Sequence, residues 1–188
     1  MQYYSKEKTI LTDVDGCLVD WVTIFHSWMK SNGHCRIKNN ASLIEQQYNL
    51  TDKQVRMLIT EFNKTDNIAS LPAFDDSVLY VKKLTELGYK FICITSIGLD
   101  TDIKNNRITN LVDLFGKNTF LDFIFLKTHQ SKTDILKKYK DAGLYWIEDN
   151  IDQYNAGVQV GLKSFYLNKN SLTNSWKEIY SRIKYDNI

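Results

Sequence analysis

Short apolar runs alternate along the chain with longer segments in which apolar residues have helical spacing. The runs cover residues 10–11, 89–95, 121–126, 144–147 and 164–167. Short apolar runs predict buried strands, and apolar residues at positions i, i+3, i+4 and i+7 predict one buried face of a helix. Strands that alternate with helices form a parallel sheet, so the pattern predicts a three-layer α/β domain.

Several of the helical segments end at a glycine, the residue that commonly follows the last turn of a helix. Apolar residues at helical spacing over residues 78–87 precede Gly88. Similar segments precede Gly116 and Gly143, and the second of these predicts a helix over residues 132–140.

One stretch interrupts the alternation, because helical patterns follow each other there without a strand between them. Apolar residues at helical spacing over residues 22–29 predict one helix, and a capping box at residues 51–54 begins another. Pro72 disfavours helical conformation at the residue before it and marks the return to the core. We therefore expect an α/β core over residues 1–17 and 72–188, with a small helical insert over residues 18–71.

The most informative motif follows the first predicted strand, where Asp13, Asp15 and Gly16 occur within four residues. Alternate residues of a strand share a face, so both carboxylates point the same way, and Gly16 permits the sharp turn that leaves them exposed. Two carboxylates so close together repel each other unless a cation lies between them. A calcium loop does not fit, because the residues after Gly16 lack further alternating oxygen ligands. The motif therefore indicates a phosphate-transfer site.

Polar side chains that suit such a site also follow the later predicted strands. Thr95 and Ser96 follow the second strand, Lys132 comes after the third, and Glu148 and Asp149 end the fourth. In a doubly wound parallel sheet, ligands bind beyond the carboxyl ends of the strands, so these residues can converge. The hydroxyls suit phosphate oxygens, and a second acidic pair beside the first would hold a hard, oxygen-ligated cation.

Composition narrows the class of protein. The 188 residues, 43% hydrophobic and 24% charged, are typical of one soluble globular domain. The net charge of +2 arises from 24 basic and 22 acidic residues without a long basic run, so nucleic acid is not favoured as the main partner.

Cys17, Cys35 and Cys93 are widely spaced and indicate neither a disulfide framework nor a zinc site. Without an apolar signal core or a stretch of about 20 apolar residues, we expect a cytoplasmic protein with no membrane partner. The oligomeric state, including a homodimer, stays open.

The ordered set of motifs at the four strand ends resembles the haloacid dehalogenase superfamily of phosphohydrolases. Within it, residues 13–21 (DVDGCLVDW), residues 71–74 (LPAF), residues 95–96, residues 132–133 and residues 147–149 are similar to the 5'(3')-deoxyribonucleotidase family. The resemblance covers nearly the whole chain. It implies a Rossmann-like three-layer parallel sheet, with the predicted insert as a small helical cap after the first strand.

The resemblance also implies magnesium-dependent hydrolysis of a small phosphate ester, with a nucleoside monophosphate as the substrate. Asp13 would attack phosphorus to form an aspartyl-phosphate, and Asp15 would protonate the leaving group and then activate water. Lys132 would stabilise Asp13 and the developing charge. The other implied site residues are Asp13, Asp15 and Asp149 for Mg²⁺, with Glu148 reaching the ion through water, and Thr95, Ser96, Gly16 and Trp21 for the substrate.

Some positions depart from the pattern of these families. Cys17 stands where the superfamily usually has Thr or Val, and Glu148 where the deoxyribonucleotidases have Asp. Residues 63–70 lack the aromatic residues that help to hold the base in that family. Trp21 is expected to stack on the base, although packing within the insert would equally explain it.

Other functions could be assigned to the same predicted catalytic residues, and they differ in whether they require all of them. A polynucleotide 3'-phosphatase, or another small-molecule phosphatase of the superfamily, would use the same set and is the alternative. Asp15 argues against a receiver-like phospho-switch and against a dehalogenase, since neither requires an acid at that position.

Overall fold

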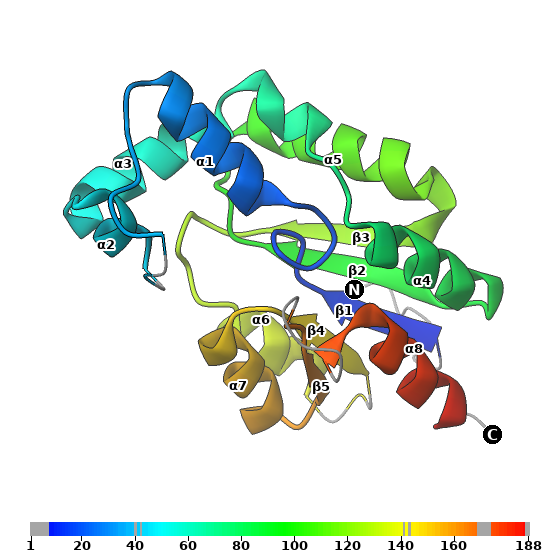
Figure 1. The fold of residues 1–188 in the computed structure, drawn as a ribbon. Helices are drawn as coiled ribbons and strands as arrows, with labels where there is room; N and C mark the ends of the chain where they lie inside the picture. The colour runs from blue at the N-terminus through cyan, green and yellow to red at the C-terminus, as the bar shows by residue number, and fades with distance from the viewer. Residues whose placement is uncertain are drawn as a thin grey trace.

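The centre of the fold is a sheet of five parallel strands in the order β3-β2-β1-β4-β5, which confirms the predicted α/β class (Figure 1). The computed structural model describes residues 8–39, 41, 43–140, 142, 144–168 and 174–186. The strands are β1 (Thr9–Thr12), β2 (Lys90–Thr95), β3 (Phe120–Phe125), β4 (Tyr145–Glu148) and β5 (Lys163–Tyr166). Each apolar run in the sequence is therefore a strand.

The first strand, β1, occupies the middle of the sheet. It pairs with β2 on one side and with β4 on the other. Its side chains Ile10 and Leu11 are completely buried and belong to the cores on opposite faces of the sheet. A central parallel strand is covered on both faces, which explains why it reads as a continuous apolar run. The residues that follow β1 consequently emerge between the ends of β2 and β4.

Helices cover both faces of this sheet, as the three-layer prediction requires. One face packs against α4 (Asp75–Glu86), α5 (Thr101–Phe115) and α8 (Trp176–Tyr185). The other face packs against α6 (Thr133–Leu136) and α7 (Ile151–Gln159). Burying each large apolar side chain between these layers contributes roughly 1.5–3 kcal/mol. No helix in the described part of the chain is both long and apolar enough to cross a membrane.

The segment between β1 and β2 is helical, and no strand occurs in it among the described residues. It contains α1 (Trp21–Ser31), α2 (Ile44–Tyr48), α3 (Asp52–Asn63) and a 3-10 turn, η2 (Asp66–Ser70). The predicted capping box opens α3. Figure 1 shows α1, α2 and α3 together at one side of the sheet. The assignment of residues 18–71 to a separate cap remains a prediction.

Two sequence predictions about the helices were wrong in detail. The helix predicted over residues 132–140 covers only Thr133–Leu136 and continues as a 3-10 turn over Lys137–Tyr139, because the backbone at Lys140 is extended, with ψ of 139°. Val22 does not lie on the buried face of α1. That face carries residues four apart, Trp21, Phe25 and Met29, so a residue one position later points to solvent.

Gly157 allows α7 to lie directly against β4. A Cβ atom at this position would lie 2.3 Å from Trp146 Cδ1 and 2.7 Å from Ser164 Oγ. Alanine in place of glycine normally stabilises a helix interior by about 1 kcal/mol. We expect Gly157→Ala to lower Tm instead, because Trp146 is completely buried and has no room to move away. Thermal unfolding will measure the change. Asn155→Ala, at an exposed position of the same helix, is the control and should not lower Tm; an equally stable Gly157→Ala protein would contradict the tight contact.

Candidate active site at the carboxyl ends of the strands

The loop after β1 turns sharply at Gly16, as the sequence predicted. Gly16 has a φ of 80°, in the left-handed region that favours glycine. A Cβ atom there would lie 1.9 Å from Asp149 Oδ2, so no other residue fits without displacing that carboxylate. The glycine therefore both turns the chain and brings the loop backbone into contact with the end of β4.

Distant parts of the chain hold this loop in place. Trp176 Nε1 in α8 donates to the Cys17 carbonyl at 3.0 Å, and Ser77 Oγ in α4 donates to the Leu18 carbonyl at 2.8 Å. Both donors lie on completely buried residues. Because these carbonyls have fixed partners, the loop has one well-defined conformation, and the side chains of Asp13 and Asp15 project from a rigid support.

Lys132 joins the ends of β1 and β4 through two ion pairs. Its Nζ lies 2.6 Å from Asp13 Oδ1 and 2.7 Å from Glu148 Oε2, and all three residues are buried. Its backbone N–H donates to Gln153 Oε1 at 2.8 Å, which anchors the start of α6 against α7. Burial opposes the charge on this lysine, but the carboxylates of Asp13 and Glu148 outweigh that effect and raise the pKa of Lys132 above its ordinary value. Lys132 is therefore a permanent cation.

The acidic pair predicted at the end of β4 lies beside Asp13, because β4 pairs directly with β1. Asp13 N donates to the Ile147 carbonyl at 2.9 Å, which continues the pairing beyond β1. The second oxygen of Glu148, Oε1, accepts hydrogen bonds from the backbone N–H groups of Asp149 and Asn150 at 3.1 and 2.9 Å. Both oxygens of Glu148 thus have partners, Lys132 and the backbone of residues 149–150, while the Asp149 side chain lies against Gly16 in the loop after β1.

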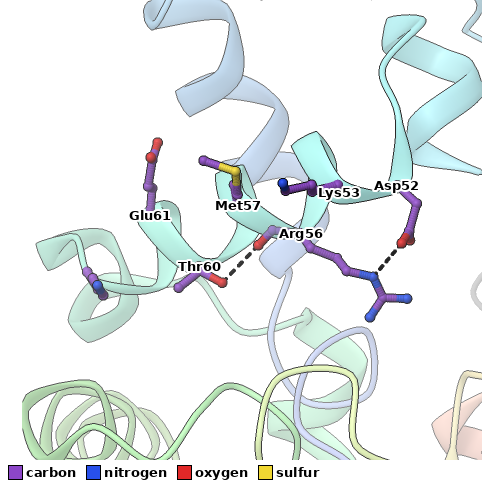
Figure 2. Close-up of a pocket in the computed structure, with 7 residues that line it drawn as sticks. Asp52, Lys53, Arg56, Met57, Thr60 and Glu61 are labelled. Atoms are coloured by element: carbon purple, nitrogen blue, oxygen red, sulfur yellow. Dashed lines mark hydrogen bonds and ion pairs between the residues drawn. The ribbon is translucent and has the colours of Figure 1, made fainter.

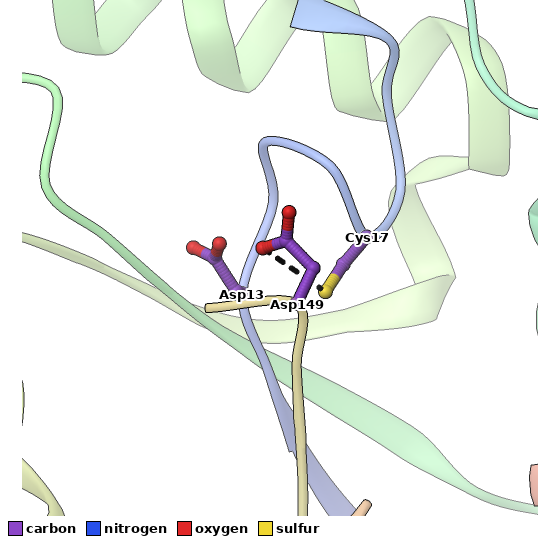
Figure 3. Close-up of side chains that lie close together, drawn as sticks. All are labelled: Asp13, Cys17 and Asp149. Atoms are coloured by element: carbon purple, nitrogen blue, oxygen red, sulfur yellow. Dashed lines mark hydrogen bonds between the residues drawn. The ribbon is translucent and has the colours of Figure 1, made fainter. Parts of the chain in front are cut away.

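Asp13, Cys17 and Asp149 form a cluster whose potential ligand atoms lie within 4.8 Å of one another (Figure 3). The Cys17 sulfur lies 4.0 Å from Asp149 Oδ1. Burial, together with the nearby negative charges, raises the pKa of the Cys17 thiol well above its ordinary value, so the sulfur is a neutral thiol and a weak ligand. The oxygen atoms of the two aspartates are therefore the principal ligands of this cluster.

The charges in the site leave room for a divalent cation. Asp13, Asp15, Glu148 and Asp149 are four carboxylates, whereas Lys132 and Arg107 are the two cations paired with them. Burial, followed by the charge of Asp13, raises the pKa of Glu148 and of Asp149. A cation bound between these carboxylates would oppose the shifts and favour the ionised forms. An excess of two negative charges on hard oxygen ligands fits Mg²⁺.

The residues predicted to bind phosphate lie at the end of β2. Thr95 Oγ1 is buried and has no hydrogen-bond partner among the described residues, so it is a donor available to a bound ligand. Ser96 Oγ donates to the Gln130 carbonyl at 2.9 Å. The structure thus leaves the Thr95 hydroxyl free and uses the Ser96 hydroxyl to hold the loop after β3.

Sequence reasoning missed Arg107. This residue in the middle of α5 is completely buried, and its Nη2 lies 2.8 Å from Asp15 Oδ1. Burial raises the pKa of Asp15, although the Arg107 charge opposes the shift. A signal was present in the sequence, since Arg107 is four residues from both Ile103 and Leu111 and so shares their face of the helix. A charged residue at such a position needs a buried partner.

Trp21 lies within an aromatic cluster of the helical segment. Its ring stacks on Phe25 at a centroid distance of 4.6 Å and meets Phe62 edge-on at 5.3 Å. Trp21 Nε1 donates to Asn63 Oδ1 at 3.0 Å, and Asn63 Nδ2 donates to the Ile97 carbonyl at 3.3 Å, which connects α1 and α3 to the loop after β2. The side chain is 8% exposed, so a base would have to stack on a small accessible part of the ring. Base stacking by Trp21 remains a prediction.

Residues on the outer face of α3 line an open pocket (Figure 2). Arg56 Nε lies 2.7 Å from Asp52 Oδ2, and Thr60 Oγ1 donates to the Arg56 carbonyl at 2.8 Å. These are local contacts of one helix turn, typical of an exposed helix surface. This face contributes nothing to the carboxylate cluster.

Comparison with known proteins identifies one related sequence. No protein family model matches the chain. A protein of Enterobacteria phage T4, described as an uncharacterized 32.4 kDa protein in the Gp30-rIII intergenic region, is 26% identical over 141 residues. The match covers 71% of this chain and 50% of the phage protein, so the chain spans about half the length of that relative.

Solved structures with a similar fold include haloacid dehalogenase-like hydrolases and phosphatases. A predicted phosphatase from Clostridium acetobutylicum has a TM-score of 0.67 and 15% identity, with 95% of this chain and 98% of that chain covered. A putative haloacid dehalogenase-like hydrolase from Bacteroides fragilis has a TM-score of 0.60 and 16% identity, with 93% and 92% covered. The D,D-heptose 1.7-bisphosphate phosphatase from B. bronchiseptica, complexed with magnesium and phosphate, has a TM-score of 0.58 and 13% identity, with 95% and 99% covered. At these identities the similarities establish the fold alone, the α/β fold that this chain shares with the three structures.

The raised pKa values of Glu148 and Asp149 predict how stability depends on pH and metal. In the absence of a divalent cation, the native state binds more protons than the unfolded chain once pH exceeds about 4, the ordinary carboxyl value. This contribution to stability therefore falls as pH rises toward the raised values. We expect Mg²⁺ to raise Tm, and to raise it more at about pH 8 than at about pH 5, because fewer protons then compete for the ligands.

Asp149→Asn should flatten this pH dependence and remove the Mg²⁺-induced shift in Tm, since the amide has no charge to titrate. Asp134→Asn is the control, because Asp134 is exposed and pairs only with Lys137 three residues later. Differential scanning fluorimetry over pH, with chelator or with Mg²⁺, provides the measurement. An Asp149→Asn protein that keeps both the wild-type slope and the wild-type shift would show that this cluster holds no cation.

Proposed function

We propose that this protein is a Mg²⁺-dependent phosphatase that hydrolyses a nucleoside monophosphate, as a 5'(3')-(deoxy)ribonucleotidase. The observation that carries the proposal is the position of Lys132, which bridges Asp13 and Glu148 at the ends of neighbouring strands, with Asp149 beside them. A nucleophilic carboxylate, a fixed cation and a free acidic ligand are the groups that phosphoryl transfer to an aspartate requires. The three free cysteines suit a reducing compartment, so we expect the reaction to take place in the cytoplasm.

In the first step, Asp13 attacks the phosphorus atom of the ester. Lys132 holds Asp13 Oδ1, which leaves the second carboxylate oxygen without a hydrogen bond in the described part of the chain and available as the nucleophile. A bond forms between this oxygen and phosphorus while the bond from phosphorus to the ester oxygen breaks. Asp15, two residues later on the same rigid loop, donates its proton to the departing alkoxide. The products are an alcohol and an aspartyl-phosphate.

In the second step, a water molecule attacks the phosphorus atom of the aspartyl-phosphate. Asp15, now ionised, removes a proton from this water, and the bond between phosphorus and the Asp13 oxygen breaks. Inorganic phosphate leaves and Asp13 returns to its carboxylate form. The same carboxyl group thus serves as acid and then as base, and the proton balance closes over one cycle.

Positive charge and hydrogen-bond donors stabilise the equatorial oxygens of the transferring group. Asp13 and Asp149, with the Asp15 backbone carbonyl and with Glu148 through water, would hold Mg²⁺, which when bound neutralises charge between the phosphate dianion and the carboxylates. The free Thr95 hydroxyl would donate to one phosphate oxygen. Ser96, whose hydroxyl donates to the Gln130 carbonyl, and Gly16, whose N–H donates to the Val19 carbonyl, would line the phosphate site from the loops on either side.

The substrate class rests on the aromatic cluster of α1 and α3 and on the resemblance to the deoxyribonucleotidases. A screen against mononucleotides, sugar phosphates and 3'-phosphorylated oligonucleotides tests it directly. Turnover confined to mononucleotides is the expected result. A preference for the oligonucleotides would instead favour a polynucleotide 3'-phosphatase.

Asp13→Asn should abolish phosphatase activity, because an amide cannot act as the nucleophile. The fold should remain intact, since Lys132 keeps its second partner, Glu148, at 2.7 Å. We expect kcat to fall by more than roughly a thousandfold, with the circular dichroism spectrum unchanged. Asp134→Asn is again the matched control and should keep full activity. A kcat of Asp13→Asn above roughly a thousandth of the wild-type value would show that Asp13 is not the nucleophile.

Trp21→Ala tests nucleotide recognition. A base stacked on an aromatic side chain is worth roughly 1–3 kcal/mol, so kcat/KM for a nucleotide should fall about fivefold to a hundredfold, while a small aryl phosphate should be spared. Trp28→Ala is the control, because Trp28 packs on the same partners, Phe25 and Phe62. If both variants lose Tm and slow both substrates equally, Trp21 is a packing residue and the nucleotide assignment loses this support.

A further inference from the structure

Arg107 is a completely buried cation at a position where packing alone would require an apolar residue. It lies in the middle of α5, and its neighbours four residues before and after, Ile103 and Leu111, are buried apolar side chains. A buried guanidinium loses its hydration and is tolerated only where a charge or several acceptors compensate. In the described part of the chain, its one charged partner is Asp15, with Nη2 lying 2.8 Å from Oδ1.

The rest of the guanidinium group is left without compensation. Arg107 Nε, Nη1 and Nη2 make no hydrogen bond of standard geometry with any described residue, so the contact with Asp15 is an ion pair at close distance. The arginine is completely buried, and its charged contact among the described residues is Asp15. We therefore expect its charge to act on the chemistry through Asp15.

Asp15 is held asymmetrically by this contact. Its Oδ1 is buried against Arg107, whereas the side chain as a whole is 24% exposed, so the accessible surface lies on its other atoms. Fixing one carboxyl oxygen restricts rotation about the side-chain torsions, while Arg107 does not hold the second oxygen at ion-pair distance. A proton donor to a leaving group needs this arrangement, with one oxygen fixed and the other accessible.

Arg107 also keeps Asp15 from competing for the other cation. Lys132 serves Asp13 and Glu148 at 2.6 and 2.7 Å. Asp15 lies two residues after Asp13, the nucleophile that Lys132 holds. Without Arg107, the Asp15 carboxylate would therefore be attracted to Lys132. Two separate cations thus give each of the two catalytic carboxylates its own partner.

We propose that Arg107 is a positioning residue, which holds Asp15 in the orientation from which it transfers protons. The proposal rests on the proposed phosphatase function, and it concerns a residue outside the motifs of that function. It predicts a loss of rate that depends on the leaving group. An alkoxide leaving group needs the proton of Asp15, whereas a dinitrophenolate leaves without one.

The experiment compares Arg107→Met, which keeps most of the side-chain volume, with wild type on a nucleotide and on 2,4-dinitrophenyl phosphate. In rapid-quench measurements of the first turnover, we expect the nucleotide reaction to slow by roughly 10- to 100-fold, part of the 10²–10⁴-fold that general acid catalysis supplies. The burst of dinitrophenolate should stay within about threefold of wild type, because aspartyl-phosphate formation then needs no acid. Later turnovers should slow on both substrates, since Asp15 also acts as the base.

Two further variants separate positioning from stability. Arg107→Lys retains the charge and should recover part of the nucleotide rate; if Arg107→Met does not fold, the same leaving-group comparison is made on this variant. Asn110→Ala, on the same buried face of α5, removes the hydrogen bond to the Leu71 carbonyl and should lower Tm without a leaving-group effect.

The outcomes distinguish this proposal from the proposed function. Equal slowing of the dinitrophenyl burst and the nucleotide reaction in the Arg107 variants would overturn the positioning role. If Asp13→Asn is inactive in the same experiments, the proposed phosphatase function would still stand. The proposed function itself fails if wild type hydrolyses no phosphate ester, or if Asp13→Asn remains active. A selective loss on the nucleotide, partly rescued by Arg107→Lys, supports the assignment of Arg107.

Discussion

The two ion pairs of Lys132 are the interaction on which the site depends. They hold together the end of β1, which carries Asp13, and the end of β4, which carries Glu148, while the backbone N–H of the same residue anchors α6 against Gln153 of α7. Lys132 is the partner that the two buried carboxylates share, so removing Lys132 would leave two uncompensated negative charges in the core, whereas removing one carboxylate leaves a matched ion pair. The arrangement therefore fixes the geometry of the nucleophile before any ligand binds.

The loop between β1 and α1 shows how packing far from the site supports this geometry. Trp176 from α8 and Ser77 from α4 hydrogen-bond to carbonyl groups of the loop, and Gly16 lets it approach Asp149 more closely than any side chain would allow. Preorganised groups lose little freedom when the reaction begins, which is a principal source of enzymatic rate enhancement. The C-terminal helix thus contributes to the site through the loop and without touching the carboxylates.

The two buried cations divide the catalytic carboxylates between them. Lys132 pairs with Asp13, and Arg107 pairs with Asp15, so the two negative charges of this short loop have separate partners. The two cations come from α5 and from the start of α6, which cover opposite faces of the sheet. With all four carboxylates ionised, Lys132 and Arg107 leave two negative charges without a partner, and burial together with the charge of Asp13 raises the pKa of both Glu148 and Asp149. A divalent ion bound among these carboxylates would stabilise their ionised forms.

Local patterns in the sequence determined the order of strands and helices, the turn at Gly16 and the acidic and hydroxyl residues at the strand ends, because periodicity, capping and turn chemistry act over a few neighbouring residues. They also indicated that Asp149 would lie beside Asp13 if the two strands were neighbours, a condition that only the pairing of β1 with β4 met. The tertiary structure alone decided that Trp21 meets Phe62 of α3 and that Arg107 reaches Asp15. Each of these depends on which distant residues come into contact, and the energy of a buried ion pair or a stacked ring exists only once the chain has brought both partners together.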